Sequence, residues 1–179
     1  AYPGTCRRYR EPRSDCAIRV RVNESTVAFD DLVRGRTEEN LASTVGDFVV
    51  RRRDGIIAYQ LATAVDDGSP AIGRVSRGND LLANTGRQIF LMEKLGQDRP
   101  VYGHVPVLVN SKGQKLSKQT HAAPLALRAA PGNLRRVLGC LGFPAAELPA
   151  EERCEDLMAW ATRAWSLTFL PRRQAIEIS

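Results

Sequence analysis

The feature that constrains this chain most is an apolar run, Val105–Val109, that leads directly into a polar loop at 110–120. Lys112, Lys115 and Lys118 fall within this loop, whereas nearly all positive charge elsewhere in the chain is arginine. A short apolar run ending in a polar loop is typical of a buried strand, and ligands bind at the carboxyl ends of strands in open α/β sheets. The loop is therefore predicted to hold a polyphosphate, with a solvated basic turn as the plain alternative.

The rest of the chain indicates an α/β order followed by a helical tail. Alternation of apolar and polar residues, or short apolar runs, predict strands at 17–22, 26–33, 47–52, 72–76 and 105–109. Helices are predicted at 57–65 and 80–95, and in the tail, where prolines separate them, at 125–130, 132–142 and 151–165. The polar segment 36–45 is predicted as a loop or a helical turn, Asp54-Gly55 as a hairpin turn and Gly96 as a helix C-cap.

The composition is that of a folded, basic protein. The chain has 179 residues, of which 43% are hydrophobic and 26% charged, and its formal net charge is +6. No apolar run approaches the roughly 18 residues that a membrane span needs. The four cysteines show no framework or C-x2-C spacing. We therefore expect a reduced, cytoplasmic protein with an anionic partner such as nucleic acid or nucleotide, although charge alone fits simple solubility equally well.

Arg77 and Tyr59 form a second candidate site. Arg77 follows a predicted short strand at a helix entry, and Tyr59 lies on the preceding predicted helix. A guanidinium can bind a carboxylate through two hydrogen bonds, and a phenol adds one directional bond. The pattern alone favours a structural ion pair from Arg77 to Asp67 or Asp80 over this carboxylate site.

Tyr2 and Cys6 could be half of a metal site, but a free cysteine in a loop is the interpretation that the sequence alone favours. His104 and His121 flank the apolar run and the lysine loop. A single histidine at a strand end more often makes a packing hydrogen bond than acts as a catalyst, and no Ser/His/Asp or Cys/His set is evident.

Four segments together resemble the class I aminoacyl-tRNA synthetases of the glutamate type: 46–67, 75–91, 101–122 and 164–171. KLSKQ at 115–119 resembles the KMSKS loop of that family, and it follows an apolar strand as the family's loop does. The continuation Thr120-His121-Ala122 and the short tail resemble the glutamyl-queuosine tRNA(Asp) synthetases, a short branch that glutamylates a modified anticodon base, more than the glutamyl-tRNA synthetases.

The resemblance implies roles residue by residue. Tyr59 and Arg77 match the glutamate-binding pair of the family. Lys118 matches its ATP-contacting residue, with Lys115 and Ser117 as further catalytic residues of the loop. Tyr2 and Cys6 match two of four zinc ligands. The implied substrates and cofactors are glutamate, ATP with Mg²⁺, a Zn²⁺ ion and the anticodon stem-loop of tRNA(Asp), in a protein expected to be monomeric and not membrane-bound.

Two alternatives stay open. The first is a truncated glutamyl-tRNA synthetase that charges the tRNA 3′ end. The second is a non-catalytic RNA-binding module that has kept the sheet and the basic tail.

The fold class implied is α/β: the second half of a Rossmann-like class I catalytic domain, with an inserted α+β piece and a C-terminal helical subdomain. The expected regions are half of a zinc-binding region at 1–16, the inserted, acceptor-binding-like piece at 17–53, the catalytic half at 54–123 and a helical tail at 124–179. Because the resemblance begins after the family's HIGH-type signature, we expect this chain to be a fragment that is inactive alone.

Overall fold

The computed structural model describes residues 1–8, 15–24, 26–120, 122–149 and 153–178. Contacts divide the chain into two compact units. The first, called here the arginine unit, comprises Ala1–Arg77 and Leu81–His104, and the second, the lysine unit, comprises Gly78–Asp80 and Val105–Ser179. Each unit has its own buried apolar cluster.

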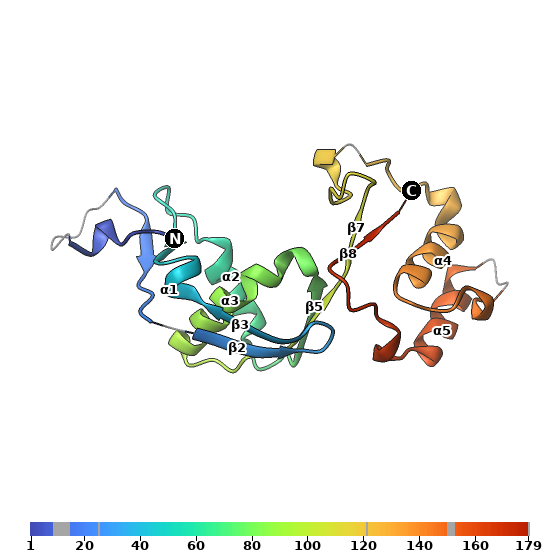
Figure 1. Ribbon diagram of the computed structural model, residues 1–179, viewed down its shortest axis with the longest axis horizontal. Helices are drawn as coiled ribbons and strands as arrows, with labels where there is room; N and C mark the ends of the chain where they lie inside the picture. The colour runs from blue at the N-terminus through green and yellow to red at the C-terminus, as the bar shows by residue number, and fades with distance from the viewer. Residues whose placement is uncertain (9–14, 25, 121, 150–152, 179) are drawn as a thin grey trace. The chain divides into compact units, whose positions relative to one another are not determined.

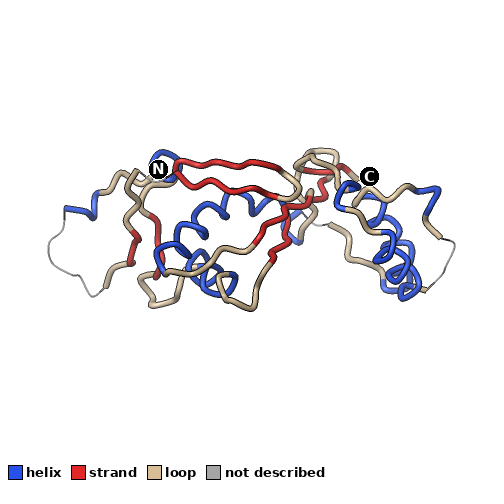
Figure 2. The backbone as a smooth tube through the Cα atoms, turned by 90° about the horizontal axis from the view of Figure 1, so that it is seen from below, coloured by secondary structure: helices blue, strands red, loops and turns tan. Residues whose placement is uncertain are grey.

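Two antiparallel strand pairs begin the arginine unit. Strand β1 (Ile18–Val20) pairs with β4 (Phe48–Arg51), and β2 (Thr26–Asp31) pairs with β3 (Gly35–Asn40). Figure 2 shows β2 and β3 as one extended hairpin. The short helix α1 (Leu41–Thr44) follows β3 and is capped by the Asn40 side chain, which accepts a hydrogen bond from the Ser43 amide.

An ion pair ties the N-terminus to this part of the unit. The Arg7 Nε donates to Asp47 Oδ2 over 2.7 Å, and its Nη2 donates to the Val22 carbonyl over 2.6 Å. Asp47 Oδ1 also accepts from the Val22 amide at 2.8 Å. The Asp47 carboxylate thus links the single-turn helix η1 (Thr5–Arg8) to the chain after β1.

The second half of the arginine unit alternates helix and strand. Helix α2 (Tyr59–Asp67) precedes β5 (Arg74–Gly78), and a short turn, η2 (Asn79–Leu81), leads into α3 (Leu82–Leu95) and then β6 (Val101–Val105), which pairs with β5. The buried face of α3 packs on α2 and β2. Aromatic rings join the elements: Phe29 lies 5.8 Å from Tyr102, and Phe48 lies 6.3 Å from Phe90, measured between ring centroids.

The lysine unit contains one parallel strand pair and a helical part. Strand β7 (Val107–Val109) pairs with β8 (Ala175–Glu177), which lie side by side in Figure 1. Helices α4 (Ala130–Cys140) and α5 (Cys154–Ala164) pack on each other around Phe143, whose ring lies 5.3–5.8 Å from those of Trp160, Trp165 and Phe169. Single 3₁₀ turns complete the unit: η3 (Lys118–Thr120), η4 (Leu127–Ala129), η5 (Ala145–Glu147) and η6 (Leu167–Phe169).

Most of the predicted elements are confirmed with shifted ends, but the predicted tail helix 125–130 forms only the 3₁₀ turn η4, and Pro131 lies inside α4. The hairpin turn at Asp54-Gly55 is present, since Arg51 bridges Ile57 and Gly55 has a φ of 85°. Gly96 ends α3 in the left-handed conformation, with a φ of 67°. None of the described helices is both long and apolar enough to cross a membrane.

The prediction for 36–45 was wrong for its first half, which forms most of β3, whereas the helical turn is present as α1. The β3 sequence is GRTEEN, which contains no apolar residue, so it carries no alternating signal. Its strand conformation comes from the backbone ladder with β2, in which Thr26 lies opposite Asn40 and Asp31 opposite Gly35. Tertiary pairing here overrides a polar sequence.

The apolar run 105–109 does not form one strand. Val105 ends β6, Pro106 interrupts, and β7 begins at Val107. Proline has no amide hydrogen for the ladder, so the two short strands take different partners, β5 and β8. Strand β8 was missed, because three residues in a segment expected to be helical are too few to show a period. The start of the predicted helix 151–165 lies partly outside the described residues.

Candidate functional site

Arg77 is a largely enclosed candidate site residue. It lies near the end of β5, and its side chain is only 9% exposed. Its Nη2 donates to Thr85 Oγ1 over 2.6 Å, and its Nε donates to His104 Nε2 over 3.1 Å. The guanidinium carbon stands 5.1 Å from the centroid of the Tyr102 ring, within the range of a cation–π contact. These contacts give the guanidinium a defined orientation.

Behind Arg77 lies a buried carboxylate–imidazole pair. His104 Nδ1 is 2.6 Å from Asp31 Oδ2, and both side chains are fully buried. The other oxygen of Asp31 accepts from the backbone amides of Val33, Arg34 and His104 at 2.8–3.1 Å. Asp31 ends β2, so the hairpin of β2 and β3 supplies the anchor of a network that ends at Arg77.

The pKa directions in this network follow from burial and hydrogen bonding. Burial lowers the pKa of His104, and the Asp31 carboxylate opposes this shift only in part. Burial raises the pKa of Asp31, but hydrogen bonds from the His104 ring and from three backbone amides outweigh it, so the net pKa is lowered. Both directions favour an ionised carboxylate beside a neutral imidazole.

One of the two structural ion pairs considered for Arg77 is present. Asp67 Oδ2 lies 3.7 Å from Arg77 Nη1, while Asp80 instead pairs with Lys115. Burial raises the pKa of Asp67, and the positive charge of Arg77 acts in the opposite direction. At 3.7 Å the Asp67–Arg77 contact is an ion pair without a hydrogen bond.

Tyr59 and Arg77 lie on two different elements, α2 and β5. Tyr59 is the first residue of α2 and is 53% exposed, and Asp67 is the last residue of that helix. A helix rises about 1.5 Å per residue, which separates the backbones of Tyr59 and Asp67 by roughly 12 Å. No hydrogen bond joins Tyr59 to Arg77. Tyr59 therefore lies at the end of α2 opposite the Asp67 carboxylate that faces Arg77.

The lysine loop is a compact turn held by its own backbone. Asn110 Oδ1 accepts from the amides of Lys112 and Gln114, and Gly113 takes a φ of 71°. The chain returns beside β7, where Lys115 bridges Val109 and the Leu116 amide donates to the Leu108 carbonyl over 2.9 Å. The loop is thus a rigid turn that presents flexible side chains.

Thr120 fastens the far end of this loop. Its hydroxyl oxygen accepts from the Ser117 amide at 3.0 Å and lies 2.9 Å from the Lys115 carbonyl, to which it can donate. The Thr120 amide also donates to the Ser117 carbonyl, over 3.2 Å. The backbone from Lys115 to Thr120 is therefore fixed by contacts within the loop.

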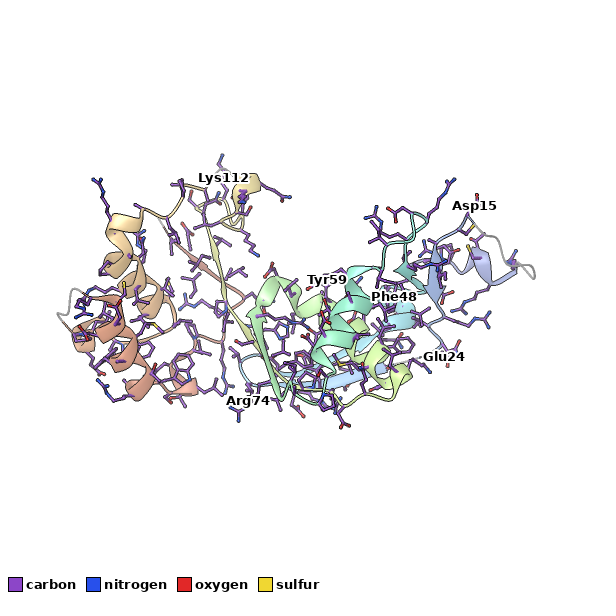
Figure 3. All side chains as sticks on the ribbon, turned by 180° about the vertical axis from the view of Figure 1, so that it is seen from behind. Asp15, Glu24, Phe48, Tyr59, Arg74 and Lys112 are labelled. Atoms are coloured by element: carbon purple, nitrogen blue, oxygen red, sulfur yellow. The ribbon has the colours of Figure 1, made fainter. Side chains whose placement is uncertain are left out.

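The three lysines of the loop differ in their surroundings. The Lys115 ammonium pairs with Asp80 Oδ2 over 2.6 Å, with 53% of its side chain exposed. Lys118 is exposed and begins η3, and Lys112 lies at the outer end of the loop, as Figure 3 shows. A cavity of about 610 Å³ beside the loop is lined by Ser117, Lys118 and Arg136 among polar groups, with apolar walls from β7 and α4.

Tyr2 and Cys6 do lie close together. The Tyr2 hydroxyl oxygen accepts from the Cys6 amide at 2.9 Å, and Cys6 is exposed. The face of the Tyr2 ring lies 4.1 Å from the Arg19 guanidinium carbon. Within the residues that the structure describes, no three His, Cys, Asp or Glu side chains gather closely enough to hold a metal ion. The two residues fit at most half of a zinc site.

The sequence patterns did not identify Asp31, Thr85 or His104 as parts of one network with Arg77. They come from β2, α3 and β6, three elements that meet only in the fold. His104 was expected to make a packing hydrogen bond, which is confirmed. His121, the other histidine, lies outside the described residues.

Comparisons of the sequence with known proteins indicate one family. The family model described as tRNA synthetases class I (E and Q), catalytic domain, matches residues 5–133. A "Glutamyl-Q tRNA(Asp) synthetase" of Methylococcus capsulatus is 45% identical over 99% of this chain and 59% of its own length. A protein of the same name from Dechloromonas aromatica is 45% identical over 98% of this chain and 59% of its own.

Among solved structures, the glutamate-tRNA synthetase of Elizabethkingia anophelis matches with a TM-score of 0.69 at 21% identity, over 91% of this chain and 36% of that one. A likeness at this identity shows the fold alone. The chain spans about 59% of the length of the curated relatives it matches.

Proposed function

This chain belongs to the catalytic-domain family of the class I tRNA synthetases for glutamate and glutamine, and on that premise we propose that the complete protein glutamylates the queuosine base of tRNA(Asp). The observation that carries the proposal is the identity of 44–45% to several proteins named "Glutamyl-Q tRNA(Asp) synthetase", along nearly the whole chain. The enclosed guanidinium of Arg77 and the exposed ammonium of Lys118 suit the two substrates, glutamate and ATP.

The reaction has two steps. An oxygen of the glutamate α-carboxylate attacks the α-phosphorus of ATP, the bond from that phosphorus to the bridging oxygen breaks, and pyrophosphate leaves. A hydroxyl of the queuosine ring then attacks the acyl carbon of the glutamyl-adenylate. AMP departs with the electrons of the acyl–oxygen bond, and the hydroxyl proton passes to solvent. Catalysis of this kind rests on positioning and on stabilisation of charge.

In this proposal Arg77 binds the side-chain carboxylate of glutamate and Tyr59 contacts the other end of the amino acid. The support is geometric: the guanidinium is oriented by His104 and Thr85, and Tyr59 begins the helix whose last residue, Asp67, lies beside Arg77. A neutral analogue would leave the Nη1 hydrogens of the guanidinium without a carboxylate acceptor, since Asp67 lies beyond hydrogen-bonding distance, and that loss is costly.

Lys118 neutralises charge on the ATP phosphates as pyrophosphate leaves, with Lys115 and Ser117 as further contributors. Lys118 is exposed on a rigid turn beside a cavity, and Lys115 already has Asp80 as a partner. Mg²⁺ would accompany ATP and share this neutralisation. Tyr2 and Cys6 would supply two of the four ligands of a structural Zn²⁺ ion, which takes no part in the chemistry.

The finer architecture is part of the same proposal. Residues 1–16 would belong to the zinc-binding region, 17–53 to an inserted piece, 54–123 to the second half of a Rossmann-like catalytic domain and 124–179 to a helical tail. We also propose that the protein is a cytoplasmic monomer that binds the anticodon stem-loop of tRNA(Asp). Its basic composition would attract the phosphate backbone of the tRNA.

The acceptor can be tested directly with the complete protein. Labelled glutamate is offered with tRNA(Asp) that carries queuosine and whose terminal adenosine lacks both ribose hydroxyls. Label is expected in the anticodon fragment after nuclease cleavage, and none with tRNA(Asp) that lacks queuosine.

Label on the 3′ end of an intact tRNA(Glu), with none in any anticodon fragment, would instead favour the glutamyl-tRNA synthetase alternative. Absence of glutamate-dependent ATP–pyrophosphate exchange would favour the RNA-binding alternative.

A further inference from the structure

The side edge of the Arg77 guanidinium is already occupied by protein groups. Nε donates to His104 Nε2 at 3.1 Å and Nη2 donates to Thr85 Oγ1 at 2.6 Å. A guanidinium carries five N–H groups, so two on Nη1 and one on Nη2 are left on its outer edge. Near that edge the structure places the Asp67 carboxylate, 3.7 Å from Nη1 and beyond hydrogen-bonding distance.

The bonds around His104 specify one protonation state. Nδ1 faces the Asp31 carboxylate at 2.6 Å, and an ionised carboxylate only accepts, so Nδ1 carries a hydrogen. Nε2 faces Arg77 Nε, which only donates, so Nε2 must offer a lone pair. The ring is therefore neutral and in its Nδ1–H tautomer.

We propose that Asp31, His104 and Thr85 are positioning residues that hold the side edge of the Arg77 guanidinium and leave its outer edge, Nη1 and Nη2, to bind one carboxylate. The inference rests on the proposed function only for the identity of that anion, the side-chain carboxylate of glutamate. Thr85, His104 and Asp31 are each less than 5% exposed, so the set is part of the packed interior rather than a surface network.

The charge on His104 determines whether this arrangement persists. An imidazolium would lose the lone pair that Arg77 Nε uses and would place two cations in contact. The charged groups acting on the ring are Asp31 on β2, Arg77 on β5 and Arg34 in the turn after β2, while α3 presents the uncharged Thr85. The lowered pKa of His104 keeps the ring neutral at physiological pH.

The first test compares two substitutions at Thr85 in the complete enzyme. Thr85→Val keeps the shape and removes the hydroxyl, and Thr85→Ser keeps the hydroxyl and removes a methyl group. We expect Thr85→Val to raise the KM for glutamate about tenfold with little change in kcat, as for the loss of one hydrogen bond to a charged group. Thr85→Ser should leave KM within about twofold while lowering the melting temperature through the lost methyl group.

If the KM for glutamate changed equally in the two variants, in step with their melting temperatures, Thr85 would be merely structural.

A matched pair of substitutions at His104 separates its hydrogen bond to Asp31 from its hydrogen bond to Arg77. The amide of His104→Asn can replace Nδ1–H toward Asp31 but offers no acceptor to Arg77, and the amide oxygen of His104→Gln can replace Nε2. His104→Gln should therefore retain more glutamate affinity than His104→Asn, and the reverse order would overturn the proposal.

A spectroscopic test needs no activity. The protein of residues 1–179 has two histidines, so ¹⁵N labelling of histidine with a His121→Ala variant assigns His104 without ambiguity. At pH 7 we expect a protonated Nδ1 and an unprotonated Nε2. A protonated Nε2 would overturn the positioning role. Failure of the complete enzyme to activate glutamate would count against the proposed function instead, and this spectrum would still decide the state of the network.

Discussion

The two units present their candidate residues in opposite ways. In the arginine unit the guanidinium of Arg77 is enclosed and its orientation is set by side chains from three other elements. In the lysine unit the backbone of the loop is fixed, whereas Lys118 projects into solvent. A fixed guanidinium can select a ligand by geometry, and a mobile ammonium can follow a charge that moves during a reaction.

The largest effect is expected from a change in the packing of the lysine unit. Phe143→Ala removes a ring that is 3% exposed and contacts three other aromatic rings, which should cost about 3–5 kcal/mol of stability. Amide hydrogen exchange should show faster exchange in α4 and α5. An equal loss of protection from amide exchange in α2 and α3 would mean that the two units unfold together, contrary to their description as separate units.

Lys118→Ala tests the charge contributed by the lysine loop. In the complete enzyme it should raise the activation barrier by about 3–4 kcal/mol, the typical cost of losing one electrostatic contact to a transition state. Because Lys118 is exposed, the free energy of unfolding should change by less than about 0.5 kcal/mol. The rate of glutamate-dependent ATP–pyrophosphate exchange and the melting temperature are measured together, with Lys112→Ala at the outer end of the loop as the control. An equal loss of activity in the control would show that Lys118 has no special role.

Arg77→Lys tests geometry rather than charge. An ammonium cannot make the planar, two-pronged contact, so glutamate activation should fall about 100-fold although the charge is retained. The matched control is Arg74→Lys on the same strand, where the arginine is exposed. Near-normal activity in Arg77→Lys would indicate that Arg77 serves only its ion pair with Asp67.

A smaller effect concerns acid stability at the other end of the arginine unit. The hydrogen bonds from Arg7 lower the pKa of Asp47 to about 2, below its value in the unfolded chain. A lowered pKa means that the unfolded state binds protons first, so the stabilisation is complete well above the ordinary aspartate pKa of about 3.9 and is lost as the pH falls through the folded pKa of about 2. Asp47→Asn should be less stable at neutral pH, and its free energy of unfolding should fall less steeply as the pH is lowered toward 2. An unchanged dependence on pH in this range would show that the Arg7–Asp47 pair does not cause it.

The smallest effect is expected at Lys115. Its pair with Asp80 is more than half exposed on the lysine side, and such pairs contribute less than about 1 kcal/mol. Lys115→Ala should therefore shift the melting temperature little and reduce activity less than Lys118→Ala does. A larger activity loss at Lys115 than at Lys118 would reverse their assigned importance.

The sequence predicted parts of the molecule whose signals are local. The strand that carries Arg77, helix α3 with its glycine cap, and the polar loop after an apolar run are confirmed because periodicity and capping residues lie close together in the chain. The polar strand β3 and the short strand β8 were missed because their pairing partners, not their own residues, define them.

The candidate site shows the same division. Lys118 and Arg77 were found through short motifs, and their roles remain predictions. The contacts of Arg77 with His104 and Thr85, and of His104 with Asp31, could not be predicted because no periodicity states which elements meet. Asp67 was named as one of two ion-pair partners, and only the fold distinguishes it from Asp80.

The division into units has a topological consequence. The backbone passes between the units three times, after Arg77, after Asp80 and after His104. A protease that cuts at any one of these junctions would leave the units covalently joined through the other two. Neither unit can therefore be exchanged as a cassette by one break in the gene, so a chimera with a related synthetase must match all three junctions at once.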